Sequence, residues 1–266
     1  MKIVFWNTNR NKDHTPVVKL VDNTGVDLLF LAECSEDAFW ELKKSYEEVI
    51  APASKSKIKC FKINQAISCY CVREISPSLI LYQAEYHTIQ CTLGVLHLRS
   101  KLYADPHFQN GLAYDCIAGI KNYEDENDNM DTVLIGDFNM NPFDPGMVVS
   151  RGFNSVCSQK IAQKNDRTVA DKVCHYFYNP SWKSFSGMGD EIYGSYYYHS
   201  CSGGHDFHWN NFDQVLLRPS VIQKYDHVFR ILHDVAGFDL TKKNNGISDH
   251  YPIFLELQEK TNVEFT

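Results

Sequence analysis

The sequence lacks the features of membrane-spanning and disulfide-stabilised proteins. No apolar stretch approaches the roughly 20 residues that cross a bilayer, and Met1 and Lys2 run straight into a strand-like segment instead of an apolar leader. Nine cysteines are present, but they are scattered, no Cys-x-x-Cys occurs, and the odd number leaves at least one thiol unpaired. These absences predict a soluble, cytoplasmic protein in which most cysteines are free, buried thiols.

An excess of positive charge is also missing. The chain has 26 Lys and Arg residues against 33 Asp and Glu residues, a net charge of −7, so no general positive field favours long duplex nucleic acid. A bound cation and a few local Lys or Arg side chains can still neutralise phosphates in one cleft of an acidic protein. The charge therefore weakens the case for a duplex-binding protein without excluding a nucleic-acid substrate.

Several common catalytic and ligand-binding motifs are absent. The sequence contains no Gly-x-Gly-x-x-Gly, no Gly-x-x-x-x-Gly-Lys, no Gly-x-Ser-x-Gly and no His-Glu-x-x-His. His205 and His208 stand three apart in a Gly-rich segment, but no companion cluster with zinc-ligand spacing accompanies them. We therefore expect these two residues to be surface loop histidines.

The composition that is present predicts one globular domain. With 266 residues and 44% apolar content the chain can bury a full core. No internal repeat, low-complexity tract or linker rich in Pro and Ser marks a boundary. We expect a single domain over residues 1–266, with a loose tail at residues 260–266.

Strand-like apolar runs alternate with helical patterns. Each run has strand length and is followed closely by a polar side chain that can hold a metal or a phosphate. The runs are residues 3–6 before Asn7, 28–31 before Glu33, 95–96 before His97, and 133–135 before Asp137. The helical patterns cover residues 17–21 before a stop at Gly25, 39–42 after the N-cap candidate Ser35, and 112–120. Such alternation predicts α/β organisation.

The middle of the chain shows little helical signal. Consecutive antiparallel strands are expected at residues 58–61, 66–72, 75–82 and 87–98. They favour mixed sheets over purely parallel ones. Residues 192–212 are rich in Gly, Tyr, His and Ser, and they predict a long loop before a strand at 214–217.

The sharpest motif is Gly136-Asp137-Phe138-Asn139, directly after a buried strand. Asp137 and Asn139 are two residues apart, so both side chains point to the same side if the chain stays extended. An acid and an amide would then be presented together. The alternative is that the tetrapeptide is an Asx-type turn that closes the strand.

A second group of polar residues also stands beside apolar strands. Asp249 and His250 form an adjacent acid and imidazole just before the apolar run at residues 253–257. Glu33 lies where a buried strand emerges, although its charge could instead serve the N-terminus of the helix after Ser35. Asn7 closes the first strand.

The order of these residues resembles that of the endonuclease/exonuclease/phosphatase (DNase I-like) family. The matching residues are Asn7, Glu33 and His97 at strand ends, Gly136-Asp137-Phe138-Asn139, Asp213, and Ser248-Asp249-His250. The match spans almost the whole chain. The resemblance implies a four-layer α/β sandwich with two facing mixed β-sheets, and hydrolysis of phosphate esters with the help of a divalent cation.

The resemblance also implies a metal site. Glu33 is similar to the family's principal metal ligand, assisted by Asn7 and Asp249, an oxygen set that suits Mg²⁺ or Mn²⁺. The chain departs from the family pattern at two positions. Ala32 stands where Gln often precedes the metal-binding Glu, and Asn9 stands where some nucleases carry an acid. The number of metal ions therefore stays open.

The catalytic groups follow from the same resemblance. Asp137 would orient or deprotonate the attacking water, and Asn139 would hold that water or a phosphate oxygen. His250, supported by Asp213, would contact the scissile phosphate or act as a base. His97 would stabilise the phosphate or protonate the leaving oxygen. The alternative for His97 is an imidazole at the edge of the core, and the alternative for Asp213 is a surface acid.

Two basic residues in His97-Leu98-Arg99-Ser100-Lys101 are candidates for substrate binding. Alternation would place Arg99 and Lys101 on the His97 side of an extended chain, near the phosphate. A solvated strand end is the competing interpretation.

The favoured function is a nuclease or phosphodiesterase that acts on nucleic acid or a nucleotide. Its further support is a set of aromatic residues that could stack unpaired bases, or could simply pack the long loop. These are Tyr196, Tyr197, Tyr198, Phe207 and Trp209. The alternatives are a phosphatase acting on small phosphorylated molecules or lipid headgroups, and a non-catalytic binding member of the family.

Overall fold

Two mixed β-sheets make up the centre of the computed structural model, which describes residues 1–51, 57–100, 106–186, 194–197, 208–235, 237–239 and 247–260. The first sheet contains β1 (Lys2–Asn7), β2 (Leu28–Ala32), β3 (Glu47–Glu48), β4 (Ile58–Lys62), β16 (Tyr225–Ile231) and β19 (Ile253–Glu259). The second contains β5 (Ser68–Ser76), β6 (Leu79–Tyr86), β7 (Ile89–His97), β8 (Thr132–Asp137), β9 (Ser155–Val156), β12 (Phe177–Tyr178) and β15 (Asp213–Leu217). The strand orders are β16-β19-β1-β2-β4-β3 and β5-β6-β7-β8-β15-β12-β9.

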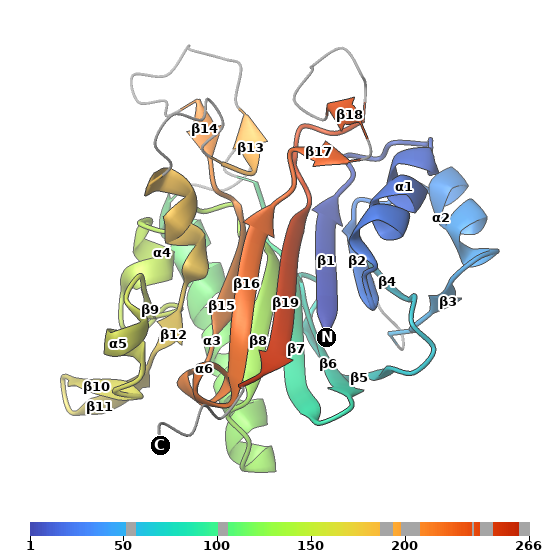
Figure 1. Ribbon diagram of the computed structural model, residues 1–266. Coiled ribbons are helices and arrows are strands. Elements are labelled where there is room, and N and C mark those ends of the chain that lie inside the picture. The colour runs from blue at the N-terminus through green and yellow to red at the C-terminus, as the bar shows by residue number, and fades with distance from the viewer. Residues whose placement is uncertain are drawn as a thin grey trace, which may run out of the picture.

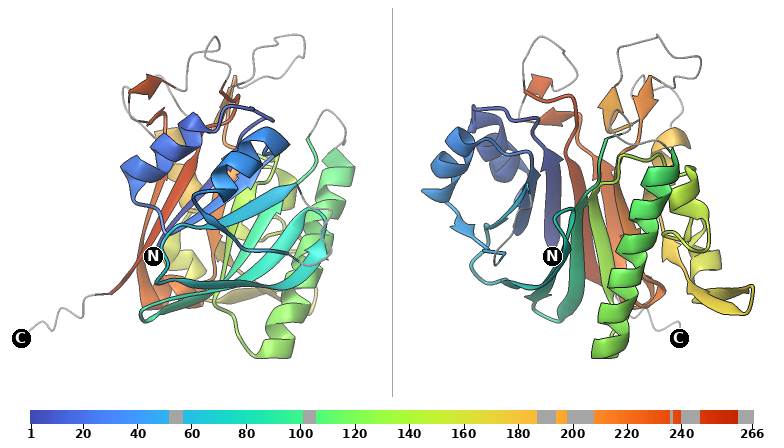
Figure 2. Two further views of the ribbon diagram at one scale, coloured as in Figure 1. Left: turned by 90° about the vertical axis from the view of Figure 1, so that its right-hand side faces the viewer. Right: turned by 180° about the vertical axis from the view of Figure 1, so that it is seen from behind.

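Helices cover the outer faces of both sheets. The helices are α1 (Thr15–Thr24), α2 (Glu36–Lys43), α3 (Pro106–Asn127), α4 (Pro145–Val148), α5 (Gln159–Ala162), α6 (Pro219–Lys224) and the 3₁₀ helix η1 (Pro180–Ser186). In Figures 1 and 2, α1 and α2 lie outside the first sheet and α3 lies outside the second. Three hydrophobic clusters fill the spaces between these layers. The layers confirm the expected α/β sandwich with two facing mixed sheets.

Alternating side chains on the central strands decide how the layers pack. In β1, Ile3 and Phe5 enter the core between the two sheets, whereas Val4 and Trp6 pack on the side of α1 and α2. β8 follows the same alternation between the inter-sheet core and the core beside α3. Because both faces of these strands are buried, their sequences are continuous apolar runs.

The predicted ends of the first two helices are confirmed. α1 has Pro16 in its first turn and ends at Gly25, whose φ of 57° is the left-handed conformation that favours glycine. α2 begins after Ser35, whose Oγ accepts a hydrogen bond from the backbone N of Ala38 at 3.1 Å. Within the described residues, no helix is both long and apolar enough to cross a membrane.

The structure corrects three of the expected strand and loop assignments in part. The predicted strand at 75–82 is split between β5 and β6 by a turn at Pro77, which has no N–H to donate to a ladder. The strand expected at 58–61 is present as β4, but it pairs with β2 and β3 in the first sheet instead of with the strand that follows it along the chain. Part of the 192–212 loop is a short antiparallel pair, β13 (Tyr196–Tyr197) with β14 (Trp209–Asn210).

Two further strand pairs lie outside the large sheets. They are β10 (Asp166–Val169) with β11 (Lys172–His175), and β17 (Asp234–Val235) with β18 (Phe238–Asp239). The eight cysteines in the described part of the chain are free thiols, as expected, but the expectation that most are buried is wrong, because only Cys60, Cys91 and Cys116 are buried.

Candidate active site

Strand ends of the two facing sheets bring the predicted polar residues together. In the second sheet the register aligns His97 of β7 with Asp137 of β8, and Asp137 with Asp213 of β15. In the first sheet β1 ends at Asn7, and its parallel neighbour β2 leads directly into Glu33. Asn7 and Asp137, from different sheets and 130 residues apart, are joined by a hydrogen bond.

Asp137 lies at the centre of the group and is fully buried. Its Oδ2 accepts a hydrogen bond from Asn7 Nδ2 at 3.2 Å, and its Oδ1 accepts one from the backbone N of Asn139 at 2.8 Å. The Nε2 atoms of His97 and His250 lie 3.7 Å and 3.9 Å from Oδ2. Both distances are too long for a direct hydrogen bond, so Asp137 Oδ2 faces two imidazoles without being bonded to either.

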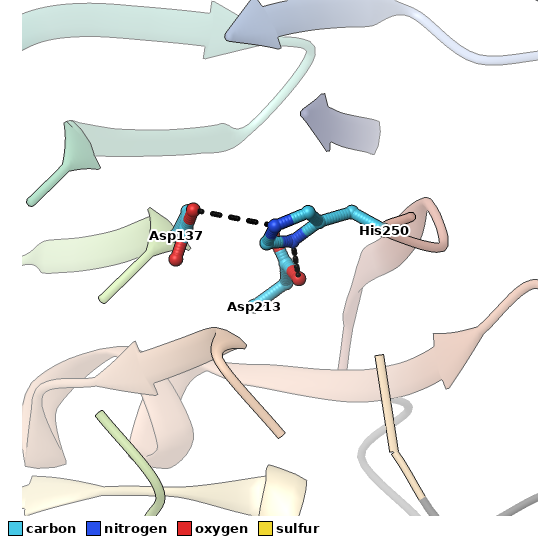
Figure 3. A group of neighbouring side chains, drawn as sticks. All are labelled: Asp137, Asp213 and His250. Atoms are coloured by element: carbon cyan, nitrogen blue, oxygen red, sulfur yellow. Dashed lines mark hydrogen bonds and ion pairs between the residues drawn. The ribbon is translucent and has the colours of Figure 1, made fainter. Parts of the chain in front are cut away.

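His250 and Asp213 form a buried imidazole–carboxylate pair. His250 Nδ1 lies 2.8 Å from Asp213 Oδ2, and the opposite ring nitrogen points toward Asp137 (Figure 3). Burial alone lowers the pKa of His250, but the carboxylates of Asp213 and Asp137 raise it, and the net result is a pKa raised to about 10. Burial raises the pKa of Asp213 to about 6, opposed by His250 and aided by Asp137. Near neutral pH the pair is therefore an imidazolium and a carboxylate.

The loop that carries His250 is tied to the first sheet. Ser248 Oγ donates a hydrogen bond to the backbone O of Asn7 at 2.7 Å and accepts one from the backbone N of His250 at 3.1 Å. Trp6 Nε1 donates to the backbone O of His250 at 2.9 Å. These bonds fix the imidazole relative to the end of β1.

The sequence analysis did not predict that Ser195 and Tyr196, at the start of β13, contact the His250–Asp213 pair and its surroundings. Ser195 Oγ accepts a hydrogen bond from the backbone N of Asp213 at 2.9 Å. The next residue, Tyr196, stacks on Phe212 with ring centroids 5.3 Å apart, and its ring lies 4.7 Å from that of His250. No periodicity in this Gly- and Tyr-rich segment could have indicated these contacts. Tyr196 thus packs against Phe212 and His250, a contact that neither interpretation of the aromatic residues had predicted.

Glu33 sits at the more open side of the group. Its φ of 49° is left-handed, and its side chain is 21% exposed. Glu33 Oε1 lies 3.6 Å from His97 Nε2, and Oε2 lies 3.5 Å from Arg10 Nε. The residue belongs to the site rather than to the cap of α2, because Ser35 provides that cap. Sequence reasoning had given Arg10 no role.

Asn139 does not continue the strand as expected. Its φ is 51°, so the chain turns at this residue, and its backbone N bonds to Asp137 Oδ1. The extended geometry was therefore wrong, and the Asx-type turn is what the structure contains. The turn keeps Asn139 buried beside Asp137, with Nδ2 donating to the backbone O of Leu98 at 2.9 Å.

The other predicted site residues are exposed or lie outside the described part of the chain. Asp249 is exposed beside His250, and its charge contributes to the raised pKa of that imidazole. Arg99 is exposed, with its guanidinium 5.8 Å from the centre of the Phe108 ring. Lys101, Tyr198, His205 and Phe207 lie outside the described residues.

Tyr197 of β13 and Trp209 of β14 pack against each other and against neighbouring aromatic rings. The ring of Tyr197 lies 4.9 Å from that of Trp209 and 6.3 Å from that of His208. Trp209 in turn contacts Tyr251 at 5.7 Å. His208 is exposed, as expected for a surface loop histidine, with a left-handed φ of 56°.

The site offers atoms that could hold a metal ion. One ligand atom each from Asp137, Asp213 and His250 lies within 4.8 Å of the other two, and all three residues are buried. The imidazole–carboxylate hydrogen bond already uses one atom of His250 and one of Asp213. Glu33 is different, because its carboxylate makes ion contacts but no hydrogen bond to any described residue. Its oxygens therefore fit the preference of Mg²⁺ and Mn²⁺ for hard carboxylate ligands.

Comparisons with known proteins identify the fold. No family model and no curated protein matches the sequence. The structure of D. rerio TDP2 complexed with single strand DNA product is 13% identical, with 97% of this chain and 98% of that chain aligned and a TM-score of 0.58. The endonuclease domain of TRAS1, a telomere-specific non-LTR retrotransposon, is 10% identical, with 98% and 99% aligned and a TM-score of 0.57. The human Nocturnin catalytic domain with bound sulfate anion is 13% identical, with 97% and 94% aligned and a TM-score of 0.56.

These neighbours are members of the DNase I-like endonuclease/exonuclease/phosphatase superfamily. At such low identity the likeness establishes the fold alone. The chain has the DNase I-like α/β fold, with two large mixed sheets.

Proposed function

Because a chain with this fold gathers acids, imidazoles and an amide at one end of its sheets, we propose that it is a divalent-cation-dependent phosphoesterase. The reaction is hydrolysis of a phosphodiester by an activated water. The observation that carries the proposal is the convergence of Asn7, Glu33, His97, Asp137 and His250 from two different sheets. Hydrolysis of a phosphate ester needs charge neutralisation, an activated water and help for the leaving oxygen, and these residue types supply all three.

Glu33 would hold the cation, assisted by Asn7 and Asp249. Glu33 provides a carboxylate that is 21% exposed and has no hydrogen bond to a described residue. Asn7 would contribute its amide oxygen, which here accepts a hydrogen bond from the backbone N of Asn9 at 3.1 Å. A bound Mg²⁺ or Mn²⁺ would neutralise charge on the phosphate oxygens.

Asp137 would orient and deprotonate the attacking water. Its Oδ1 accepts a hydrogen bond from the Asn139 backbone, and its Oδ2 accepts one from Asn7 and faces the two imidazoles. The remaining acceptor capacity of Oδ2 would take the water proton. Asn139 would hold the water or a phosphate oxygen through its second amide N–H, since the first is bonded to Leu98.

The two imidazoles would act on the phosphate itself. His250, kept protonated by Asp213, would donate from Nε2 to a non-bridging oxygen as negative charge builds up in the transition state. His97, between Glu33 and Asp137, would stabilise the phosphate or protonate the leaving oxygen.

Nucleic acid or a nucleotide is the substrate class that we favour. One structural neighbour was solved with a single strand DNA product and another is an endonuclease domain. In this chain Tyr197 and Trp209 offer partly exposed rings for unpaired bases, and Arg99 and Lys101 would bind phosphates. A phosphatase of small phosphorylated molecules or lipid headgroups is the second candidate, favoured by the net charge of −7.

The deciding experiment is product release from a panel of single-stranded DNA, duplex DNA, RNA, nucleotides and inositol phosphates, with Mg²⁺ or Mn²⁺ and with a chelator. Glu33→Ala, Asp137→Ala and His250→Ala should each lower cation-dependent turnover by more than ~100-fold. Asp166→Ala is the matched control, because this exposed acid lies on β10, away from the site.

Each outcome of the panel assigns a function. Cleavage of nucleic acid that is lost in the three variants supports the nuclease. Hydrolysis of inositol phosphates alone would replace it with the phosphatase. Absence of turnover in the folded wild-type protein with every substrate would leave a non-catalytic binding protein as the better description.

A further inference from the structure

Arg10 lies beside the candidate metal ligand with most of its guanidinium unused. Its side chain is 72% exposed, and its Nε lies 3.5 Å from Glu33 Oε2. This distance is an ion contact that is longer than an ordinary hydrogen bond. Among the described residues the guanidinium has no hydrogen-bond partner. An arginine fork with free donors therefore faces solvent at the edge of the site.

The backbone around Arg10 holds this position firmly. Arg10 has a φ of 58° and Asn9 a φ of 47°. This left-handed region is unfavourable for arginine, whereas asparagine adopts it more readily. The Arg10 backbone N donates to the backbone O of Glu33 at 2.9 Å. Ser35 Oγ donates to the backbone O of Asn11 at 2.8 Å, which ties the same loop to the start of α2. Strained conformations that the surrounding structure maintains are typical of functional loops.

The chemistry of this arrangement fits a phosphate better than a permanent ion pair. An exposed ion pair of this kind stabilises little, whereas a guanidinium fork matches two oxygens of one phosphate. A cation on Glu33 would compete with Arg10 for the same carboxylate. Arg99 is less suited to bind this phosphate, because its guanidinium already lies over the Phe108 ring.

We propose that Arg10 is a substrate-binding residue that donates to a phosphate oxygen of the substrate, and that Glu33 holds it in position until a cation takes the carboxylate. This inference rests on the proposed phosphodiester substrate. It makes two predictions of opposite sign for Arg10→Ala: tighter cation binding and weaker substrate binding. A residue that only neutralised Glu33 would produce the first effect without the second.

The test compares the wild-type protein, Arg10→Ala and Lys12→Ala. Lys12 is the matched control, because it carries the same charge two residues away, is 81% exposed, and pairs with Asp37 at 3.3 Å instead of with the site. Mn²⁺ affinity is measured by calorimetry without substrate. Binding of a fluorescein-labelled, phosphorothioate-linked oligothymidylate of about ten nucleotides is measured by anisotropy in Mn²⁺ at several salt concentrations.

For Arg10→Ala we expect Mn²⁺ affinity to rise about 2- to 5-fold, since an exposed ion pair no longer competes for Glu33. Oligonucleotide affinity should fall about 10-fold, with the slope of log Kd against log salt reduced by about 0.7. Lys12→Ala should leave Mn²⁺ affinity unchanged and the oligonucleotide affinity within about twofold.

Unchanged oligonucleotide affinity in Arg10→Ala would overturn the inference, even if Mn²⁺ binds more tightly. Equal losses in both variants would also overturn it, because they would indicate a general charge effect. If the wild-type protein does not bind the oligonucleotide, the nucleic-acid assignment fails and this role of Arg10 fails with it. Cleavage of nucleic acid by the wild-type protein together with unchanged binding in Arg10→Ala would leave the proposed function intact and reject only Arg10.

Discussion

The charge on His250 can be measured through the pH dependence of stability. The pKa of this imidazole is raised from 6.5 to about 10, because Asp213 and Asp137 outweigh the effect of burial. Between these values the folded protein keeps a proton that the unfolded chain has lost. The stabilisation that protonated His250 gives the folded protein is therefore fully present below about pH 6.5 and is lost as pH rises toward about 10.

Linkage sets the size of the effect. One extra proton in the folded state lowers the free energy of unfolding by about 1.4 kcal/mol per pH unit. Between about pH 7 and about pH 8.5 the contribution of His250 to the free energy of unfolding should therefore fall by about 2 kcal/mol. Above this window the buried thiols begin to contribute, because burial raises the pKa of Cys91 and similar residues above that of unfolded cysteine.

The assay is urea unfolding of the protein in chelator, with the double variant His250→Gln, Asp213→Asn as the comparison, because neither amide can titrate and because removing His250 alone would raise the pKa of buried Asp213 further. The buried Met1 amino group, whose pKa is lowered mainly by burial, titrates in the same window in both proteins and cancels from the difference. The slope of the variant should be shallower by about 1.4 kcal/mol per pH unit. Equal slopes would refute the reasoning, because they would mean that folded His250 is already neutral near pH 7.

Two further predictions concern the stability of the fold. Gly136→Ala should destabilise the protein by more than ~2 kcal/mol in thermal or urea unfolding, because φ is +153° and the new Cβ would lie 2.0 Å from a backbone oxygen of the neighbouring strand. Gly111→Ala, in the middle of α3 with nothing within 4 Å of its Cβ, should instead stabilise by about 0.5–1 kcal/mol; equal effects of the two changes would contradict the argument. Glu124→Gln should lower the free energy of unfolding by about 3–5 kcal/mol, since it leaves buried Arg218 without the carboxylate that it contacts at 2.7 Å and 2.9 Å. Replacing Glu124 and Arg218 together by Leu and Met should cost clearly less than the single change, and a double variant as unstable as the single would contradict this account.

The order and spacing of residue types along the sequence predicted much of the fold and of the candidate site. Apolar runs predicted the central strands, and local caps at Gly25 and Ser35 predicted where α1 ends and α2 begins. The motif around Asp137 and the pair Asp249-His250 marked the polar ends of strands. These features depend on interactions between residues close together in the sequence, which a linear pattern records directly.

Tertiary structure alone decided how those parts meet. The side chain of Asn139 is held by the backbone O of Leu98, 41 residues earlier in the chain. The contacts of His250 with Tyr196 and Asp213 depend on which strands pair and on how the sheets face each other. The position of Arg10 beside Glu33 likewise depends on distances between segments far apart in sequence. The same is true of the pKa values of His250 and Asp213. No local periodicity contains such distances, because packing between the sheets sets them.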